Sequence, residues 1–344
     1  MRQKTIYVLT MFFWMPLWLI VTLNSLNSFL RTGYFELDQY IEIVKLKWDN
    51  PLWILVGMAV WMGLVYWLAC RKKVSTRQLQ NIALGIAGGI SLLAILLFRS
   101  IAKCDSEFVS NTAIQFLQNN YEAFAVGEYL YRYPFQIGIT ALLELIYGVF
   151  GVQNYIVFEL INLVCIVDIV RTLGRISEEL FGEETARIEI VMSMGLLPLF
   201  LLSTFVYGDY IGLFFGIHAI AAVIGFLKEN KWQKILQASF WFAGGVAIKN
   251  NINVLVIAAI IVLILYAFIY HKYWVLVWTA GLVLMSRMGL DIIMWIYELR
   301  MGQPVPDGIP KIAWITMSMQ ETVEGGSASG WYNRYNCSVF ADNG

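Results

Sequence analysis

The chain has 344 residues, of which 59% are hydrophobic and 14% charged, and its mean hydropathy is +0.65. Soluble globular chains are about 45–50% apolar and about 25% charged, so this composition excludes a soluble protein and predicts a polytopic membrane protein. The 24 Lys and Arg balance the 24 Asp and Glu, which leaves no bulk positive field to attract nucleic acid.

The cysteines and histidines are scattered, without the spacing of metal ligands or of a disulfide framework. We therefore expect no metal and no cofactor. A single disulfide between Cys104 and Cys337 stays open, because both are expected on the outer side of the membrane.

A spanning helix needs about 20 mostly apolar residues, because the hydrocarbon core is about 30 Å thick. About nine stretches meet this condition: 5–26, 52–70, 81–102, 154–173, 188–205, 210–227, 232–248, 252–270 and 273–296. The first follows two basic residues, as in a signal peptide. It is too long for one and lacks a small-residue cleavage site, so we interpret it as a retained anchor.

Basic residues in short loops mark the cytoplasmic side. Two such groups lie at 71–77 and 228–234. They place the N-terminus in the cytoplasm, and the connection 27–51, the loop 103–153 and the tail 297–344 outside. We expect a transmembrane domain over 1–296 and an extracytoplasmic tail over 297–344, which has no obvious terminating element and is expected to continue in the natural chain.

The two basic groups indicate the same topology only if the segment 134–150 begins and ends on the same side of the membrane. This segment is apolar but short and carries Glu144. We predict a re-entrant or interfacial helix on the outer face. The alternative is one more full span, with one basic group misread.

Charges inside the membrane are costly and need partners. Asp168 is expected to pair with Arg171, three residues further along its helix. His218 stands alone on an apolar helix, where packing with one hydrogen bond is the expected role.

The outer surface combines acids, cations and aromatic rings. The candidates are Asp105, Glu107, Arg132, Tyr133, Tyr207, Asp209, Lys249, Asn250, Trp331 and Asn333. A carboxylate there can take a proton from a hydroxyl, cations can hold a phosphate, and rings can stack on sugars. The alternative is an ordinary belt of aromatic rings and snorkelling cations.

The order of several short motifs resembles that of a known family. They are Asp105 with Glu107, the segment Tyr129–Pro134 leading to Gln136 and Gly138, Thr204–Asp209, Ala247–Asn250, Asp307–Lys311 and Gly330–Asn333. From about residue 100 to its end, the chain resembles bacterial, mainly Firmicute-type, multi-pass glycosyltransferases of the protein-O-mannosyltransferase-like group, which have the GT-C membrane fold.

This resemblance implies an all-α GT-C-like transmembrane bundle with interfacial helices on its outer face. It implies an inverting transfer of a hexose from a polyprenyl-phosphate-linked donor to a glycan, lipid or protein acceptor, without a metal. By position, Asp105 becomes the base, with Glu107 as neighbour or substitute. Lys249 and Arg132 are assigned to the donor phosphate, and Asp209 to the substrate cavity.

Two other classes compete with this interpretation. A transporter or flippase of polyprenyl-linked or other amphiphilic substrates is the first alternative, but such proteins often carry paired repeats and this sequence has no visible repeat. A membrane scaffold without catalysis is the second, and it predicts that Asp105→Asn leaves function untouched.

Overall fold

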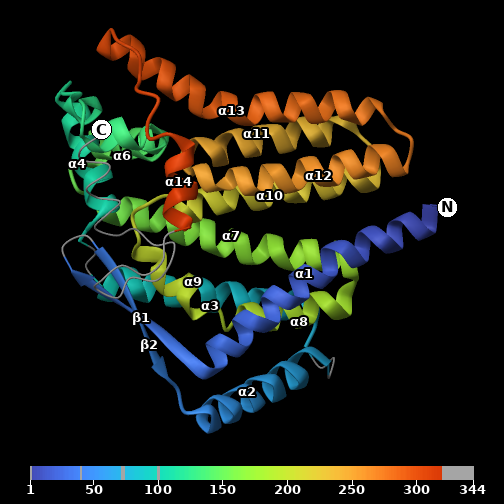
Figure 1. Cartoon of the computed structure of the whole chain (residues 1–344). Helices are drawn as coiled ribbons and strands as arrows, with labels where there is room; N and C mark the ends of the chain where they lie inside the picture. Colours follow the sequence, from blue (N-terminus) through green and yellow to red (C-terminus); the bar gives the residue numbers. More distant parts are fainter. Residues whose placement is uncertain (1, 39–40, 71–73, 99–100, 320–344) are drawn as a thin grey trace. The chain divides into compact units, whose positions relative to one another are not determined.

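The structure is a computed structural model that describes residues 2–38, 41–70, 74–98 and 101–319. The chain divides into two units, and each is described by itself. The first comprises 1–64 and 310–344, and the second comprises 65–309. Nearly all described elements are helical (Figure 1).

The first unit contains the long helix α1 (Arg2–Leu30), most of α2 (Pro51–Val65) and the short α14 (Lys311–Ser318). Between α1 and α2 the chain forms an antiparallel hairpin of β1 (Arg31–Asp38) and β2 (Ile41–Trp48). The sequence predicts only an outer connection over 27–51, so this hairpin is an additional element that its pattern does not predict.

The second unit is a helical bundle. Its elements in chain order are η1 (Tyr66–Cys70, a π-helical turn that continues α2), α3 (Thr76–Leu97), α4 (Asp105–Leu117), η2 (Glu122–Phe124), α5 (Tyr129–Arg132), η3 (Pro134–Gln136), α6 (Ile137–Phe150) and α7 (Tyr155–Phe181). They continue with α8 (Glu183–Ser193), α9 (Leu197–Leu201), η4 (Leu202–Thr204), α10 (Asp209–Glu229), α11 (Trp232–Ile248), η5 (Asn250–Ile252), α12 (Asn253–Ile269) and α13 (Trp274–Met301).

Helices α10 to α13 share one apolar core, built around buried side chains such as Phe226, Phe242, Leu263 and Leu282. Glycines allow the close approach of α10 and α11. A Cβ atom on Gly244, for example, would lie 2.7 Å from the Phe215 ring. Small residues at helix contacts are typical of membrane bundles, where close packing replaces the hydrophobic effect between helices.

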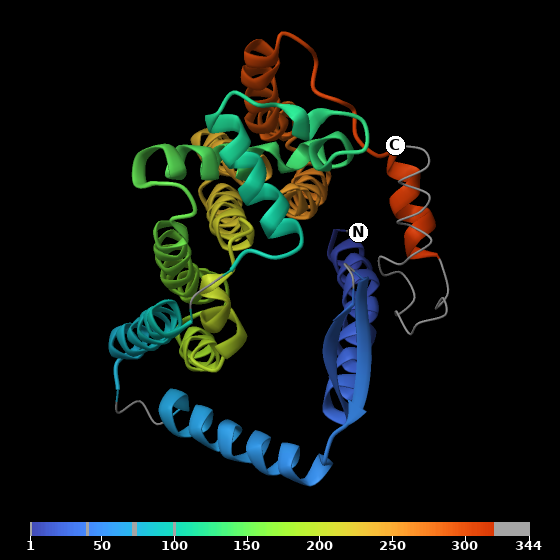
Figure 2. The ribbon, with the colours of Figure 1, turned by 90° about the vertical axis from the view of Figure 1, so that its left-hand side faces the viewer.

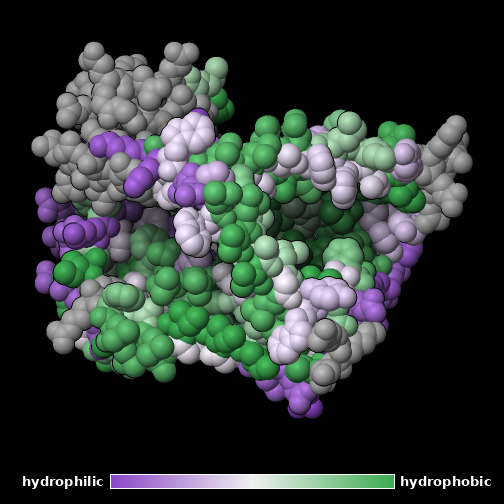
Figure 3. Space-filling model, turned by 90° about the horizontal axis from the view of Figure 1, so that it is seen from below, coloured by the Kyte–Doolittle hydropathy of each residue, from purple (hydrophilic) through white to green (hydrophobic). Residues whose placement is uncertain are grey.

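Among the described residues, six helices are long and apolar enough to cross a membrane, or up to eight if each of two bent pairs counts as one span. These pairs are 122–132 with 134–150, bent by 102°, and 183–193 with 197–204, bent by 56°. The surface in Figure 3 is widely hydrophobic, with hydrophilic residues gathered near its margins. The chain is therefore a multi-pass helical membrane protein.

By length and composition, the described helices support six to eight spans, fewer than the nine expected. Helix α7 was expected to span but carries Glu159, Asp168 and Arg171 within its apolar stretch, and α11 has only 17 residues. The expected span 188–205 is instead a bent pair, broken near Pro198, which cannot continue a regular helix.

The expected span 81–102 is displaced toward the N-terminus. Ser75 caps α3, since its side chain accepts from the Gln78 backbone while the Gln78 side chain accepts from the Ser75 backbone. Such a capping box fixes the first turn, so the helix begins at Thr76. The 102° bend before α6 fits both interpretations of 134–150, an interfacial or re-entrant helix and a broken span.

The two ends of the second unit differ. Short helices α4 and α6 lie across one end, here called the α4–α6 end, where α10 and α12 begin and α11 and α13 finish (Figures 1 and 2). The opposite end, here called the basic end, carries Lys228, Lys231 and Lys234. Near it, the buried Arg187 donates to the backbone oxygens of Leu68, Ala69 and Val74.

Candidate functional site

The site lies at the α4–α6 end and begins with the first turn of α4. Asp105 is the first residue of this helix, where the helix dipole favours a carboxylate. The buried hydroxyl of Ser106 donates to the backbone oxygen of Val206 over 2.8 Å. This bond holds the start of α4 against the segment that precedes α10.

That segment is also held from α7. The buried amide of Asn162 donates to the backbone oxygens of Ser203 and Phe205, at 3.0 and 2.9 Å. It thereby satisfies carbonyl groups that the break before α10 leaves without helical partners. Gly208 follows at a φ of 81°, a left-handed conformation that favours glycine, and turns the chain into α10 at Asp209.

Tyr207 is the centre of the polar contacts. Its hydroxyl donates to Oδ2 of Asp105 over 2.7 Å and accepts from Nε2 of Gln136. The hydroxyl of Tyr129 lies 3.4 Å away. Burial raises the pKa of the Tyr207 phenol above its usual range, and the neighbouring Tyr129 and Asp105 raise it further. The phenol therefore stays protonated and able to donate.

Lys249 approaches Tyr207 from the end of α11. Its ammonium group lies 3.7 Å from the centre of the Tyr207 ring and 2.9 Å from Oδ1 of Asp209. The lysine side chain is only 11% exposed, whereas that of Asp209 is 42% exposed. Gly212 makes this approach possible, because a Cβ atom there would lie 2.7 Å from Cβ of Lys249.

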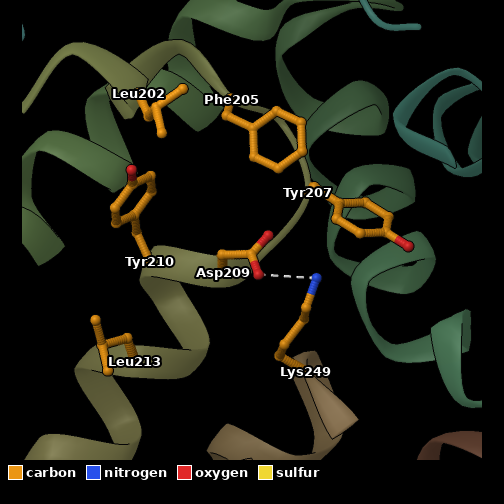
Figure 4. Close-up of a pocket in the computed structure, with 7 residues that line it drawn as sticks. All are labelled: Leu202, Phe205, Tyr207, Asp209, Tyr210, Leu213 and Lys249. Carbon is orange, nitrogen blue, oxygen red and sulfur yellow. Dashed lines mark ion pairs between the residues drawn. The ribbon is translucent and has the colours of Figure 1, made fainter. Parts of the chain in front are cut away.

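These residues border a cavity of about 380 Å³ (Figure 4). Its lining is Leu202, Phe205, Tyr207, Asp209, Tyr210, Leu213 and Lys249. The walls are thus mainly apolar and aromatic, with one ion pair. In Figure 4 the Tyr207 hydroxyl points away from the space between the other side chains. Asp105 does not line the cavity and is connected to it through Tyr207.

The structure brings four of the expected site residues together: Asp105, Tyr207, Asp209 and Lys249. Glu107 is exposed in the same turn as Asp105. Its role as neighbour or substitute base stays a prediction.

Three further candidates contact other residues of the described chain. Asn250 accepts from the side chain of Asn253 and so belongs to the start of α12. Tyr133 borders the network, because its ring packs near that of Tyr129. The backbone oxygen of Arg132 accepts from the amide of Ile309, and its buried Nε has no hydrogen-bond partner among the described atoms.

Some expectations fall outside the described residues. Trp331 and Asn333 are among them, and so is Cys337, the proposed partner of Cys104. The pairing and the two tail candidates stay predictions. Within the described part of the chain, no group of three or more His, Cys, Asp or Glu is arranged to hold a metal ion.

Two members of the network are not among the site residues predicted from the sequence. Gln136 and Tyr129 bond to Tyr207 across more than 70 positions of the chain, and no local spacing signals such a contact. The expected roles of His218 and Asp168 are confirmed: the His218 ring packs on Trp241 and makes a hydrogen bond, and Asp168 pairs with Arg171. What was not predicted is that His218 bonds to Asp168 itself, with its Nε2 2.6 Å from Oδ2, whereas Nη1 of Arg171 lies 3.7 Å from Oδ1. An ionisable group in an apolar helix was the available signal.

Comparison with protein-family models, with curated proteins and with solved structures finds no match for this chain.

Proposed function

We propose that this protein transfers a hexose from a polyprenyl-phosphate-linked donor to an acceptor hydroxyl at the outer face of the membrane. The observation that carries the proposal is a cavity with apolar walls and one lysine, joined through Tyr207 to an exposed carboxylate. An amphiphilic phosphate needs both an apolar surface and a cation. An attacking hydroxyl needs a base.

The residues take the following roles in this proposal. Asp105 accepts the proton of the acceptor hydroxyl, while the acceptor oxygen forms a bond to the anomeric carbon. The bond from that carbon to the phosphate oxygen breaks in the same displacement, which inverts the centre, and polyprenyl phosphate leaves with the electron pair. Lys249 stabilises the charge on the leaving phosphate, and Arg132 is its proposed second cation.

The finer architecture belongs to the same proposal. We assign the chain a GT-C-like fold with α4 and α6 as outer interfacial helices, a cytoplasmic N-terminus and an extracytoplasmic C-terminal tail. The acceptor is a glycan, a lipid or a protein. The position of basic residues opposite the cavity supports this orientation, since such residues favour the cytoplasmic side.

A transfer assay tests the reaction. The full chain, purified into lipid nanodiscs, is given radiolabelled sugars on a panel of polyprenyl phosphates with a cell-envelope extract as acceptor. Asp105→Asn should lower kcat by about 10²–10⁴-fold and leave donor affinity unchanged, because a base acts mainly in the transition state. Glu122→Gln, an exposed acid of the same outer loop, is the matched control with normal turnover.

Two further variants separate the roles. Lys249→Met should weaken donor binding, whereas Lys103→Met, an exposed lysine near the same end, should not. If Asp105→Asn keeps full activity and Glu107→Gln loses it, the base is Glu107. If the folded wild-type protein transfers no sugar from any donor, the enzyme proposal is wrong.

One observation favours the transporter alternative. The close contact of Asp168 with His218 places an ionisable pair between α7 and α10, away from the cavity. Transporters use such intramembrane charges for ion pathways. A liposome assay that follows the flipping of a fluorescent polyprenyl-phosphate lipid decides this alternative, which requires movement of the lipid without sugar transfer.

A further inference from the structure

The Tyr207 hydroxyl is surrounded by three polar groups whose donor and acceptor capacities differ. Asp105 presents a carboxylate oxygen, which when ionised can only accept. Gln136 presents its amide nitrogen, which can only donate. The Tyr129 hydroxyl, at 3.4 Å, can do either. A phenol has one proton to give and two lone pairs with which to accept.

These capacities fix the direction of every bond in the group. The single phenolic proton of Tyr207 goes to Asp105, so Tyr207 can only accept from the other two. Gln136 donates to one lone pair, and Tyr129 donates to the other. The reverse orientation of the Gln136 amide would set two acceptors, its oxygen and the carboxylate, against one proton.

We infer that Gln136 is a positioning residue that directs the Tyr207 proton to Asp105 and thereby fixes the orientation of this carboxylate. The inference rests on the proposed function for its catalytic consequence, since Asp105 is the base of that reaction. With Oδ2 occupied by Tyr207, Oδ1 of Asp105 is the oxygen that takes the proton of the acceptor hydroxyl.

Gln136 is itself firmly held. It is 7% exposed and closes the η3 turn, where its backbone N–H donates to the backbone oxygen of Tyr133 over 2.9 Å. The hydroxyl of Thr140 donates to the backbone oxygen of Gln136 over 2.9 Å. The residues next to Asp105 and Tyr207 are also joined, because the hydroxyl of Ser106 donates to the backbone oxygen of Val206. This bond fixes the position of Asp105 relative to Tyr207. The chain of donors therefore runs between two fixed backbone segments.

The decisive variant is Gln136→Glu, which keeps the size of the side chain and reverses its polarity. The introduced carboxylate accepts the Tyr207 proton and withdraws it from Asp105. We expect kcat to fall at least 10-fold at neutral pH with donor affinity unchanged. As the pH falls and the introduced acid becomes protonated, it can donate again, so kcat relative to wild type should recover.

Gln136→Met is the matched variant, since it removes the donor without adding an acceptor. Its kcat should fall less and show no recovery on acidification. In a Tyr207→Phe background, Gln136→Glu should change kcat by less than 2-fold, because the group that links Gln136 to Asp105 is gone. Equal losses in both Gln136 variants at every pH, or a full effect in the Tyr207→Phe background, would overturn the inference.

A spectroscopic measurement separates this inference from the proposed function. The infrared carboxylate band of Asp105 is identified as the difference between wild type and Asp105→Asn. Gln136→Glu and Tyr207→Phe should each shift this band in the same direction. A shift without sugar transfer from any donor would retain the hydrogen-bond chain and reject the transferase. An unmoved band in both folded variants would reject the chain itself.

Discussion

At the scale of single residues, the contact between Lys249 and Asp209 is asymmetric. The lysine side chain is nearly buried, whereas the aspartate side chain is almost half exposed to its surroundings. Losing the partner is more costly for the group that is more deeply buried, because an uncompensated buried charge has no solvent to replace the lost contact. Removing Asp209 should therefore destabilise the fold more than removing Lys249, because it leaves the more deeply buried charge unpaired.

Asp209→Asn should lower the free energy of unfolding by about 1–2 kcal/mol, a value reduced from that of fully buried pairs because Asp209 is partly exposed. Lys249→Met should cost less, since the remaining carboxylate is partly solvated. The double variant should be less destabilised than the sum of the two changes. Unfolding by SDS in mixed micelles measures all three. A strictly additive double variant would show that the two side chains do not interact.

The sequence indicates part of this site. Asp105, Asp209 and Lys249 stand out because each charged residue comes at the end of an apolar stretch, where a helix brings it to the membrane boundary. Gln136 gives no such signal, since its contact with Tyr207 depends on how α6 meets the segment before α10. Asn250 is the reverse case, a residue predicted in the site that the structure places in a local contact. Its side chain accepts from Asn253 at the start of α12.

At the scale of elements, one glycine determines how closely α6 and α11 meet. A Cβ atom on Gly138 would lie 1.7 Å from the backbone oxygen of Ala247, so a larger residue must separate the two helices. Ala247 is two positions before Lys249. The contact therefore links the helix that follows Gln136 to the helix that carries Lys249.

Gly138→Ala should lower the free energy of unfolding by about 1–3 kcal/mol through overpacking and should also weaken donor binding through the displacement of Lys249. Gly148→Ala, in the same helix, is the control. Its Cβ would lie 3.4 Å from a Leu117 methyl group, and alanine favours a helix over glycine by up to about 1 kcal/mol. SDS unfolding and donor titration provide the measurements. Equal stabilities of the two variants would contradict the close contact.

A second contact joins α4, α6 and α13. Arg300 makes two bonds to Glu144, at 2.7 and 3.0 Å, and a third to the backbone oxygen of Phe116 at 3.1 Å. The Tyr297 hydroxyl also donates to Glu144. A planar guanidinium suits this forked arrangement, which an ammonium group cannot reproduce. Glu144, costly in an apolar helix, is thus fully paired.

Arg300→Lys should lower the free energy of unfolding by about 1–3 kcal/mol, because it loses charge-assisted hydrogen bonds while keeping the charge. The control is Arg175→Lys, an exposed position on α7, for which we expect a change below about 0.5 kcal/mol. Both are measured by SDS unfolding. If Arg300→Lys costs no more than Arg175→Lys, the bonds from Arg300 do not hold the three helices together.

The elements themselves follow from hydropathy more reliably than their ends do. The apolar stretches of α10 and α12 are long enough that their positions are evident. The start of α3 depends instead on a capping box at Ser75, and the break before α9 on Pro198. The hairpin of β1 and β2 is not evident from hydropathy, because it lies between two strongly apolar helices in a stretch that reads as their connection.

At the scale of the whole molecule, the site residues and the basic cluster lie at opposite ends of the second unit. Asp105, Tyr207 and Lys249 lie at the α4–α6 end, and the lysines of the 228–234 turn lie at the basic end. Successive helices α10, α11, α12 and α13 run between these ends. Positive loops favour the cytoplasm, so the site should face outward.

Cysteine labelling tests this orientation in intact cells. In a chain whose four native cysteines are replaced, single cysteines at Glu122 and Asp307 should react with a membrane-impermeant maleimide, since both positions are exposed at the α4–α6 end. Cysteines at Lys231 and His271 should react only after the membrane is permeabilised. Reversed labelling would place the site in the cytoplasm. Labelling of His271 and Asp307 from the same side would show that α13 does not cross the membrane, because these positions flank that helix.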